Sequence, residues 1–395
     1  MFGSSKTEKI ISLLLFMALF GSCTIFRQKH EYFINEALET NLQLNDSITI
    51  NGIFDTGSSL FCIDSLIVNK LKVKNYFFHN ISGVGVSSKK AMIVTDTLKV
   101  TVANNHYTSS ITTVTDIKRF AGRKLDAILG NMMFSENMVF VSSEQNSLEI
   151  IKDSSAINFS EYKKLPYKYI NGKLIIDAKI DIDNNLSFNG KFLLDTGFNG
   201  QLYLNKNLQD KFNIESKIKK KAYYCSTTNG IGGKSEGFLF SAKSIRFAAF
   251  KLDKIAADCT KDTTGAFARN KDFDGMIGHG ILKKFDVIFD FRNQVVYLKP
   301  GKEFTKLSAR PKVGFSFVDR TDLNKGFIVN SIVKESNAEK AGLRLNDEIV
   351  VFNGARVENE GVDFIKEINT QKIVKLIVKR GTEFVNITFK KSSLY

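Results

Sequence analysis

The feature that most constrains this 395-residue chain is a short motif that occurs twice. It reads Ile-Phe-Asp-Thr-Gly-Ser-Ser-Leu at residues 53–60 and Phe-Leu-Leu-Asp-Thr-Gly-Phe-Asn-Gly at residues 192–200. Each copy places one carboxylate, Asp55 or Asp195, in a tight turn behind a short apolar strand. Asp-Thr-Gly should arise by chance at about one position in several thousand. Two copies behind apolar runs therefore indicate a duplicated unit that contributes one carboxylate per copy.

The sequence downstream of each motif is also repeated. Leu-Asp-Ala-Ile-Leu-Gly at 125–130 follows Asp55, and Phe-Asp-Gly-Met-Ile-Gly at 273–278 follows Asp195, at similar separations. A short helical stretch and two apolar runs come after each glycine. Several features that recur in one order are stronger evidence for duplication than a single motif.

These paired motifs resemble the pepsin and retropepsin type of aspartic peptidase, over roughly residues 40 to 300. The resemblance implies that Asp55 and Asp195 are catalytic and meet at the interface of two lobes. It also implies supporting roles around this dyad: Thr56 and Thr196 hydrogen-bond across it, Gly57 and Gly197 allow close approach of the backbone, and Ser58 hydrogen-bonds to Asp55. Position 198 departs from the family, because Phe198 stands where Ser, Thr or Ala is usual.

A glycine-bearing segment lies between the two motifs of each repeat. The glycines are Gly83 and Gly85 in the first repeat and Gly230, Gly232 and Gly233 in the second. Glycine at a hairpin tip permits positive φ angles and motion. The second segment resembles a retropepsin flap, and we expect two flaps; two ordinary surface hairpins are the alternative.

The sequence of the C-terminal region differs from that of the two repeats and resembles a bacterial PDZ domain. The residues that carry the resemblance are Ala341-Gly342-Leu343, Asp347-Glu348-Ile349 and Asn353-Gly354, in that order. Gly314, Phe315, Ser316 and Phe317 fall where PDZ domains place their carboxylate-binding loop, although a plain strand start is the alternative. PDZ domains recognise peptide termini by adding a strand to a sheet edge, so peptide or protein termini are the partners that the resemblance implies.

The N-terminus predicts export. Lys6 and Lys9 precede an apolar run at 10–20, and small residues follow, which is the pattern of a secretory signal. Gly21-Ser22-Cys23 resembles the bacterial lipoprotein signal, although Phe20 stands where Leu is usual. Lipidation of Cys23 would anchor the protein at the outer membrane or cell surface of a bacterium. The alternative is an ordinary signal peptide or uncleaved anchor with an incidental cysteine.

The net charge and the cysteine and histidine residues bear on which binding partners, disulfides and metal sites the sequence allows. The net charge of +15 raises nucleic acid or an anionic membrane as partners. The lysines are scattered, no recognition motif is present, and export argues against nucleic acid. Cys62, Cys225 and Cys259 remain after Cys23, and the last two lie where a bridge inside the second repeat is conceivable. With four histidines and no ligand spacing, we expect no metal site and no cofactor.

The three prolines, Pro166, Pro300 and Pro311, mark the domain boundaries. We expect a mainly β chain with a bilobal, acid-protease-like pair of β-barrels followed by a PDZ domain, itself a partly open β-barrel with helices. The expected segments are a signal peptide (1–22), a tether (23–38), lobe 1 (39–152), a linker (153–166), lobe 2 (167–300), a second linker (301–310) and the PDZ domain (311–392).

Two functions from different classes are consistent with this organisation. The first is an exported aspartic endopeptidase that hydrolyses peptide bonds with a water activated between Asp55 and Asp195. The second is a catalytically silent peptide-binding lipoprotein that uses the lobe cleft and the PDZ domain as interaction modules. Both aspartates and both glycine turns are present, which favours the first, whereas Phe198 keeps the second open.

Overall fold

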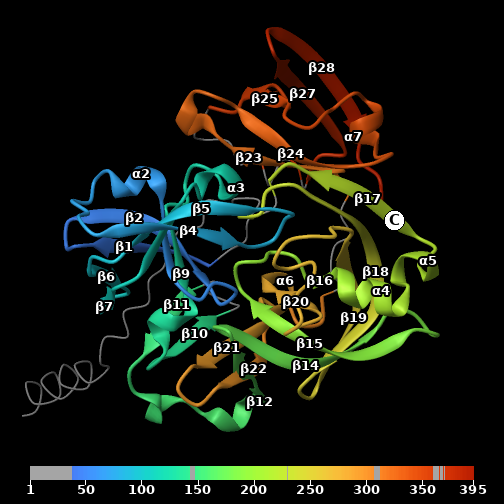
Figure 1. The fold of residues 1–395 in the computed structure, drawn as a ribbon. Helices are drawn as coiled ribbons and strands as arrows, with labels where there is room; N and C mark the ends of the chain where they lie inside the picture. The colour runs from blue at the N-terminus through green and yellow to red at the C-terminus, as the bar shows by residue number, and fades with distance from the viewer. Residues whose placement is uncertain are drawn as a thin grey trace, which may run out of the picture.

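The computed structural model of the chain describes residues 38–142, 147–228, 230–306, 312–358, 364, 368 and 370–395. Two β-rich lobes lie side by side, with a third, C-terminal domain above them and a shared sheet below (Figure 1). The predicted mainly β class is confirmed. The predicted signal peptide, most of the tether and Cys23 lie outside the described residues. Within the described residues, no helix is long and apolar enough to cross a membrane.

The first lobe is built on a nine-stranded sheet in the order β4-β5-β8-β3-β9-β2-β1-β6-β7. Its strands are β1 (Glu39–Leu44), β2 (Ile48–Asp55), β3 (Phe61–Asp64), β4 (Tyr76–Ser82), β5 (Ser88–Val94), β6 (Leu98–Val102), β7 (Asn105–Ser109), β8 (Thr112–Thr115) and β9 (Ala127–Gly130). Its short helices are α2 (Ser65–Val68), α3 (Lys118–Ala121) and the 3-10 helix η1 (Asn131–Phe134).

The second lobe and the C-terminal domain share a fourteen-stranded sheet. The strands of the second lobe are β13 (Lys168–Ile170), β14 (Lys173–Asp181), β15 (Ser187–Asp195), β16 (Leu202–Leu204), β17 (Lys221–Ser226), β18 (Ser235–Phe247), β19 (Phe250–Thr260) and β20 (Gly275–Gly278), and its helices are α4 (Lys206–Phe212), α5 (Ile214–Lys217) and α6 (His279–Leu282). The C-terminal domain contains β23 (Phe315–Asp319), η4 (Thr321–Leu323), β24 (Phe327–Val333), α7 (Asn337–Lys340), β25 (Glu348–Phe352), β26 (Ala355–Arg356), β27 (Ile373–Arg380) and β28 (Glu383–Lys390).

A five-stranded sheet joins the two lobes from below (Figure 1). Its order is β11-β10-β21-β22-β12, and its strands are β10 (Met138–Ser142), β11 (Ser147–Ile151), β12 (Lys163–Pro166), β21 (Phe285–Asp290) and β22 (Val295–Pro300). Segment 153–166, expected only to link the lobes, also holds η2 (Ser154–Ala156) and η3 (Phe159–Glu161) and ends in β12, which pairs with β22. Proline is tolerated in β12 because this strand lies at the edge of the sheet.

The duplication found in the sequence recurs in the strand pairing. In the first lobe β2 pairs in parallel with β9, which sets Asp55 opposite Gly130. In the second lobe β15 pairs in parallel with β20, which sets Asp195 opposite Gly278. Each apolar-apolar-Gly segment is therefore the strand beside its own Asp-Thr-Gly strand.

One hydrophobic core runs through both lobes and fixes their relative position. Phe54, the residue before Asp55, packs edge-on against Phe134 of the first repeat at 5.4 Å and Phe289 of the second at 5.7 Å between ring centroids. All three rings are fully buried. Burying a large aromatic ring contributes roughly 1.5–3 kcal/mol, so the shared cluster holds the two Asp-Thr-Gly turns against each other.

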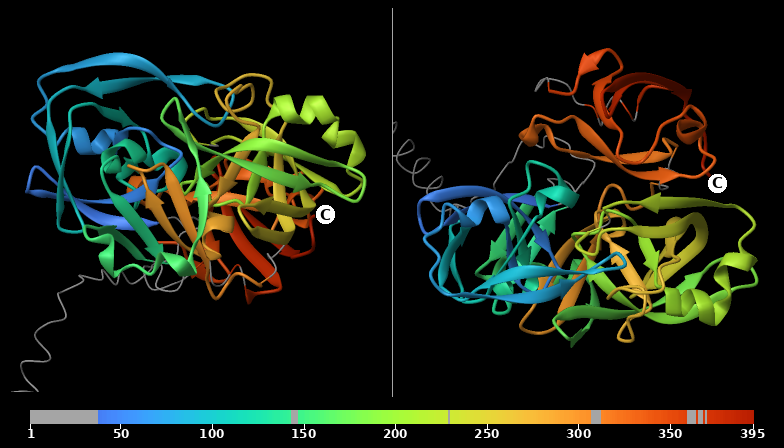
Figure 2. Two further views of the ribbon diagram at one scale, coloured as in Figure 1. Left: turned by 90° about the horizontal axis from the view of Figure 1, so that it is seen from below. Right: turned by 45° about the horizontal axis from the view of Figure 1, so that its top comes forward.

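The C-terminal domain continues the sheet of the second lobe. Its strand β24 pairs antiparallel with β17, from Tyr224 opposite Val333 to Ser226 opposite Ser331. Figure 2 shows the domain lying over both lobes from two further directions. It has its own buried core, which includes Phe327, Phe352 and Phe389. The domain therefore folds around its own core but is tied to the lobe by main-chain hydrogen bonds.

Candidate active site

The two aspartates are held in matching turns at the ends of β2 and β15. The backbone N–H groups of Gly57 and Ser58 donate to Asp55 Oδ1 at 2.8 and 3.1 Å. In the second lobe, the N–H groups of Gly197 and Phe198 donate to Asp195 Oδ1 at 2.9 and 3.0 Å. Each carboxyl therefore keeps one oxygen tied to its own turn and presents the other to the interface.

The threonines of the two motifs bond across the interface. The Thr56 N–H donates to Thr196 Oγ1 at 3.0 Å, and the Thr196 N–H donates to Thr56 Oγ1 at 3.1 Å. Each hydroxyl in turn donates to a carbonyl of the other lobe: Thr56 to Leu194 at 2.8 Å and Thr196 to Phe54 at 2.7 Å. These four buried bonds lock the turns in a two-fold arrangement.

Close approach explains why both turns carry glycine after threonine. A Cβ atom added at Gly57 would lie 2.4 Å from Asp195 Oδ2, and one added at Gly197 would lie 2.5 Å from Asp55 Cγ. No side chain fits in either gap. Each carboxyl therefore lies against the backbone of the opposite turn, and the two carboxyls are within hydrogen-bonding reach of each other.

Burial and mutual proximity shift the protonation of the pair. Burial raises the pKa of the Asp55 carboxyl. Burial, and then the charge of Asp55, hold the pKa of the Asp195 carboxyl well above its usual range. Two buried carboxyls in contact cannot both ionise easily, so they share a proton. The arrangement holds one acid and one base at the same point.

A lysine that the sequence analysis did not single out also reaches the dyad. Lys173 begins β14, and its ammonium donates to the carbonyl of Gly57 in the other lobe. It comes directly after an Asn171-Gly172 turn that reaches across to the first lobe, where Ser59 Oγ donates to the Gly172 carbonyl at 2.9 Å. The charge of Lys173 lowers the pKa of both Asp55 and Asp195, against the larger effect of burial. The only local signal for this residue was the Asn-Gly turn before it.

Ser58 hydrogen-bonds to Asp55 as expected, but through its backbone and not through its hydroxyl. Its hydroxyl donates to the Leu60 carbonyl at 3.1 Å, and only its backbone N–H bonds to Asp55. Phe198 supplies the same backbone bond to Asp195, so its lack of a hydroxyl removes no contact that the first lobe has. The Phe198 ring instead fills space beside Gly200 and Gly278, where an added Cβ would lie 2.1 and 2.5 Å from it. At this position both turns therefore bond their aspartate through the backbone N–H alone.

The two expected flap segments meet each other. The first is the tip of the β4–β5 hairpin, where the Val84 carbonyl accepts from the Gly232 N–H at 2.8 Å. The Gly232 carbonyl accepts from the Ser87 N–H at 3.1 Å and from its hydroxyl at 2.8 Å. The tip is too close for side chains, because a Cβ at Gly85 would lie 2.4 Å from the Gly232 backbone. The other expected glycines, Gly83, Gly230 and Gly233, lie in the same pair of loops.

A cavity of about 560 Å³ lies beneath these tips. Asp55 and Asp195 line it, together with residues of both flap segments and Lys173. The lining also includes Asn330, whose amide donates to the Thr228 carbonyl at 3.3 Å. The C-terminal domain therefore contributes a residue to the wall of the cavity.

The expected peptide-binding loop of the C-terminal domain precedes β23. Gly314 has φ +84°, and a Cβ there would lie 2.6 Å from Ser336 Cβ. Phe315, Ser316 and Phe317 start β23, which pairs with β24 and with no other strand among those described. At the far end of β23, the Asp319 carbonyl accepts from the Arg123 N–H of lobe 1 at 2.9 Å. The first part of the strand thus keeps an edge that an added peptide strand can pair with.

The three described cysteines, Cys62, Cys225 and Cys259, are free. Cys259 is buried in the core of the lobes, whereas Cys225 packs against the core of the C-terminal domain, so the bridge that the sequence left open between them does not form. Burial raises the pKa of the Cys62 thiol to about 11. Among the described residues, no group of three or more His, Cys, Asp or Glu side chains is arranged to hold a metal ion.

Comparison with known proteins identifies one part of the chain. A family model described as a PDZ domain matches residues 311–390. No curated protein matches the chain. The match confirms the predicted C-terminal PDZ domain, and with it the predicted fold class of a mainly β chain that ends in this domain.

Proposed function

We propose that this protein is an aspartic endopeptidase whose dyad is Asp55 and Asp195. One observation carries the proposal: two buried carboxyls from duplicated turns lie within hydrogen-bonding reach of each other and line a cavity large enough for a peptide segment. An isolated Asp-Thr-Gly turn has a structural explanation as a capped strand end. Two such turns, cross-bonded so that their carboxyls face one another, leave a pair of raised pKa values that is typical of a catalytic site.

The geometry supports hydrolysis by an activated water. The form of the dyad that can act in this way holds one proton. The ionised carboxyl takes a proton from a water between the two, while the protonated carboxyl donates to the scissile carbonyl oxygen. The proton belongs to the pair, because the two groups titrate together. The Thr56 and Thr196 bonds keep both groups in place through this exchange.

The PDZ domain adds a peptide-binding module to this site. PDZ domains capture peptides by strand addition, and β24 of this domain pairs with β17, which leads directly into the second flap segment. We propose that the domain recruits or orients peptide or protein substrates. Its Asn330 side chain, which lies on the cavity wall, places the module beside the cleft.

We further propose that the protein is exported and held at a bacterial membrane surface through a lipid on Cys23. The basic start, the apolar run and Gly21-Ser22 before the cysteine support this. Cys23→Ser should move the protein from the membrane fraction to the soluble fraction, or leave its signal uncleaved. Mass spectrometry of the mature N-terminus measures this directly, and an unmodified start at another residue would contradict it.

The test of the proposed activity is a digest of a peptide library with the purified protein between pH 4 and pH 8. We expect new peptide termini that are absent when the same digest is run with the Asp55→Asn/Asp195→Asn variant. The competing function, a silent peptide-binding protein, makes a different prediction. In that case both proteins bind library peptides equally and neither produces new termini at any pH, which would overturn the endopeptidase proposal.

A further inference from the structure

A second carboxyl lines the same cavity, away from the dyad, and the proposed mechanism does not use it. Asp258 lies near the end of β19 and faces the cavity. The hydroxyl of Tyr224 donates to its Oδ2 at 3.0 Å. Its Oδ1 is enclosed and has no hydrogen-bond partner in the described part of the chain. A buried acceptor without a hydrogen bond destabilises the folded protein, so this oxygen needs an explanation.

The register of the sheet shows what surrounds Asp258. Leu193 on β15 stands opposite Met276 on β20, Met276 stands opposite Tyr203 on β16, and Tyr203 stands opposite Asp258 on β19. Residues paired in this way point to the same face of a sheet, and all four line the cavity. The row therefore starts two residues before Asp195, runs over apolar and aromatic surface and ends at a carboxyl.

We call the side of the cavity along this row, from Leu193 to Asp258, the trough. Its walls are apolar. Phe267 stacks on Tyr203 at 4.5 Å between ring centroids, and Phe273 lies 6.0 Å from Phe267. The three rings belong to one buried cluster with Leu193 and Met276. A trough of this kind binds the stem of a long side chain by removing apolar surface from water. Its end carries an acceptor, not a further apolar group.

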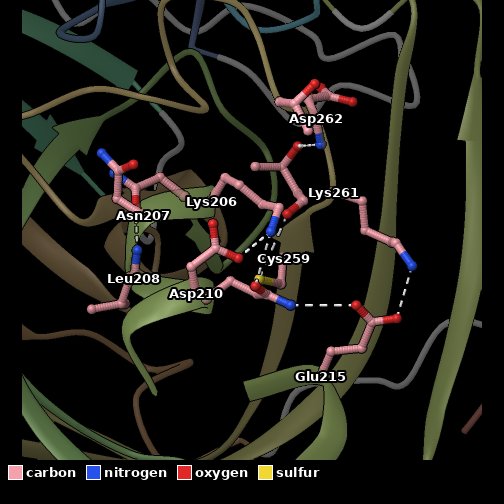
Figure 3. Close-up of polar contacts among 12 residues, drawn as sticks. Lys206, Asn207, Leu208, Asp210, Glu215, Cys259, Lys261 and Asp262 are labelled. Carbon is pink, nitrogen blue, oxygen red and sulfur yellow. Dashed lines mark hydrogen bonds and ion pairs between the residues drawn. The ribbon is translucent and has the colours of Figure 1, made fainter. Parts of the chain in front are cut away.

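The two charged residues that follow β19 both have partners, in contrast to Asp258 Oδ1. Lys261 pairs with Glu215 at 2.8 Å, as Figure 3 shows. Both oxygens of nearby Asp262 accept bonds, from the Ser235 hydroxyl at 2.7 Å and from the Glu236 N–H at 2.8 Å. Asp262 is thus a satisfied structural carboxyl. Asp258, four residues earlier, differs from it in two ways: the residue lines the cavity, and one oxygen of its carboxyl, the enclosed Oδ1, has no hydrogen-bond partner among the described residues.

We infer that the trough from Leu193 to Asp258 is a substrate subsite that takes a basic side chain, Lys or Arg, with the carboxyl of Asp258 binding its charged tip. This inference rests on the proposed function, because the basic side chain belongs to the peptide that the dyad would cleave. A cation satisfies a buried carboxyl better than a neutral donor does. Apolar walls with one charged group at the end fit a side chain with an aliphatic stem and a cationic tip. Asp258 lies three strand spacings, about 14 Å along the sheet, from Leu193, so the basic residue lies some positions away from the cleaved bond.

The charge state of Asp258 gives the inference a measurable signature. Burial raises the pKa of its carboxyl to about 8; the Tyr224 hydroxyl and the nearby Cys259 N–H, which is not in good hydrogen-bond geometry, oppose that rise. The other titratable groups facing it, Tyr203 and Asp262, offer no positive charge; Asp262 raises the pKa further. The empty subsite is therefore protonated at pH 6.5, whereas a bound ammonium favours the ionised form. Binding a Lys side chain should then release about one proton, and a norleucine side chain should release none.

The test compares one substrate sequence with Lys, Arg, norleucine or Glu placed in turn at each position around the cleaved bond. In the full-length protein we expect one position at which Lys or Arg raises kcat/KM by about tenfold or more over norleucine. Asp258→Asn should remove that preference, so that the Lys, Arg and norleucine substrates are cleaved with similar kcat/KM. Asp253→Asn, the same change on the exposed side of the same strand, is the matched control and should keep the preference.

Equilibrium binding separates this inference from the proposed activity. The same peptides are bound to the Asp55→Asn/Asp195→Asn variant, which cannot cleave and whose dyad does not titrate. Affinity for the Lys peptide relative to the norleucine peptide should rise by up to about tenfold per pH unit from pH 6 to pH 8, and Asp258→Asn should abolish the rise. If the wild type hydrolyses no peptide but this rise appears, the subsite stands and the peptidase proposal fails. If peptides bind or are cleaved with no basic preference, or if Asp258→Asn keeps it, the subsite inference is overturned.

Discussion

Asp55→Asn and Asp195→Asn should each reduce kcat for peptide hydrolysis by on the order of a thousandfold or more, and the double variant should be little worse than either single variant. The reason is geometric. Each carboxyl lies against the backbone of the opposite turn, and the pair shares one proton, so removing either partner removes both the acid and the base. Members of one catalytic unit are not additive in their effects. Single-turnover assays of the three purified variants measure this directly.

The fold provides the control for this result. Asparagine has the size of aspartate and can accept the same N–H bonds from the turn, so the melting temperature should not fall in either variant. Asp126→Asn is the matched change in the other repeated motif, where the carboxyl pairs with Lys118 at 2.9 Å and does not line the cavity. It should keep activity within a few fold. Substantial activity in either dyad variant, with the fold intact, would contradict the shared-dyad mechanism.

The repeat was the most informative part of the sequence, and the structure explains why. Each Asp-Thr-Gly strand pairs in parallel with the apolar-apolar-Gly strand of its own lobe. Because both strands belong to one copy of the repeat, the sequence of that copy is enough to predict the pairing. The PDZ signature was equally local, and the family match confirms it. The assignment of Asp55 and Asp195 as catalytic stays a prediction, because geometry alone does not show turnover.

What the sequence did not reveal depends on contacts between distant segments. Lys173 reaches the dyad only because its hairpin turn crosses to the other lobe. Asp258 faces the cavity only because β16 and β19 are neighbours in the sheet, with Tyr203 opposite Asp258. The Ser58 hydroxyl turned to its own loop because the Leu60 carbonyl lies within its reach, which no family pattern encodes.

Substitution of Lys173 is expected to have the second large effect, a change in the pH range over which the dyad is active. Its ammonium donates to the Gly57 carbonyl, and Lys173 lines the same cavity as the two aspartates. A nearby positive charge favours the ionised form of a carboxyl, and this charge lowers the pKa of both Asp55 and Asp195. Burial alone would therefore leave the dyad doubly protonated, and inactive, over a wider range of pH.

Removing the charge should move both limbs of the kcat/KM profile toward higher pH. The acid limb reports the first ionisation of the pair and the alkaline limb the second. Because both pKa values rise when the cation is lost, activity at mildly acid pH should fall by about tenfold or more, while activity on the alkaline side is kept.

Three variants at this one position separate charge from positioning. Lys173→Arg keeps the charge and should leave the profile in place. Lys173→Gln keeps a donor for the Gly57 carbonyl without the charge, so its profile should shift while its maximum kcat is retained. Lys173→Met loses both and should show the same shift with a lower maximum, because the first turn loses a bond that fixes it. A residue that served only to hold the turn would lower kcat in Lys173→Met without moving either limb. Unshifted limbs in both neutral variants would therefore show that the dyad is tuned by burial alone.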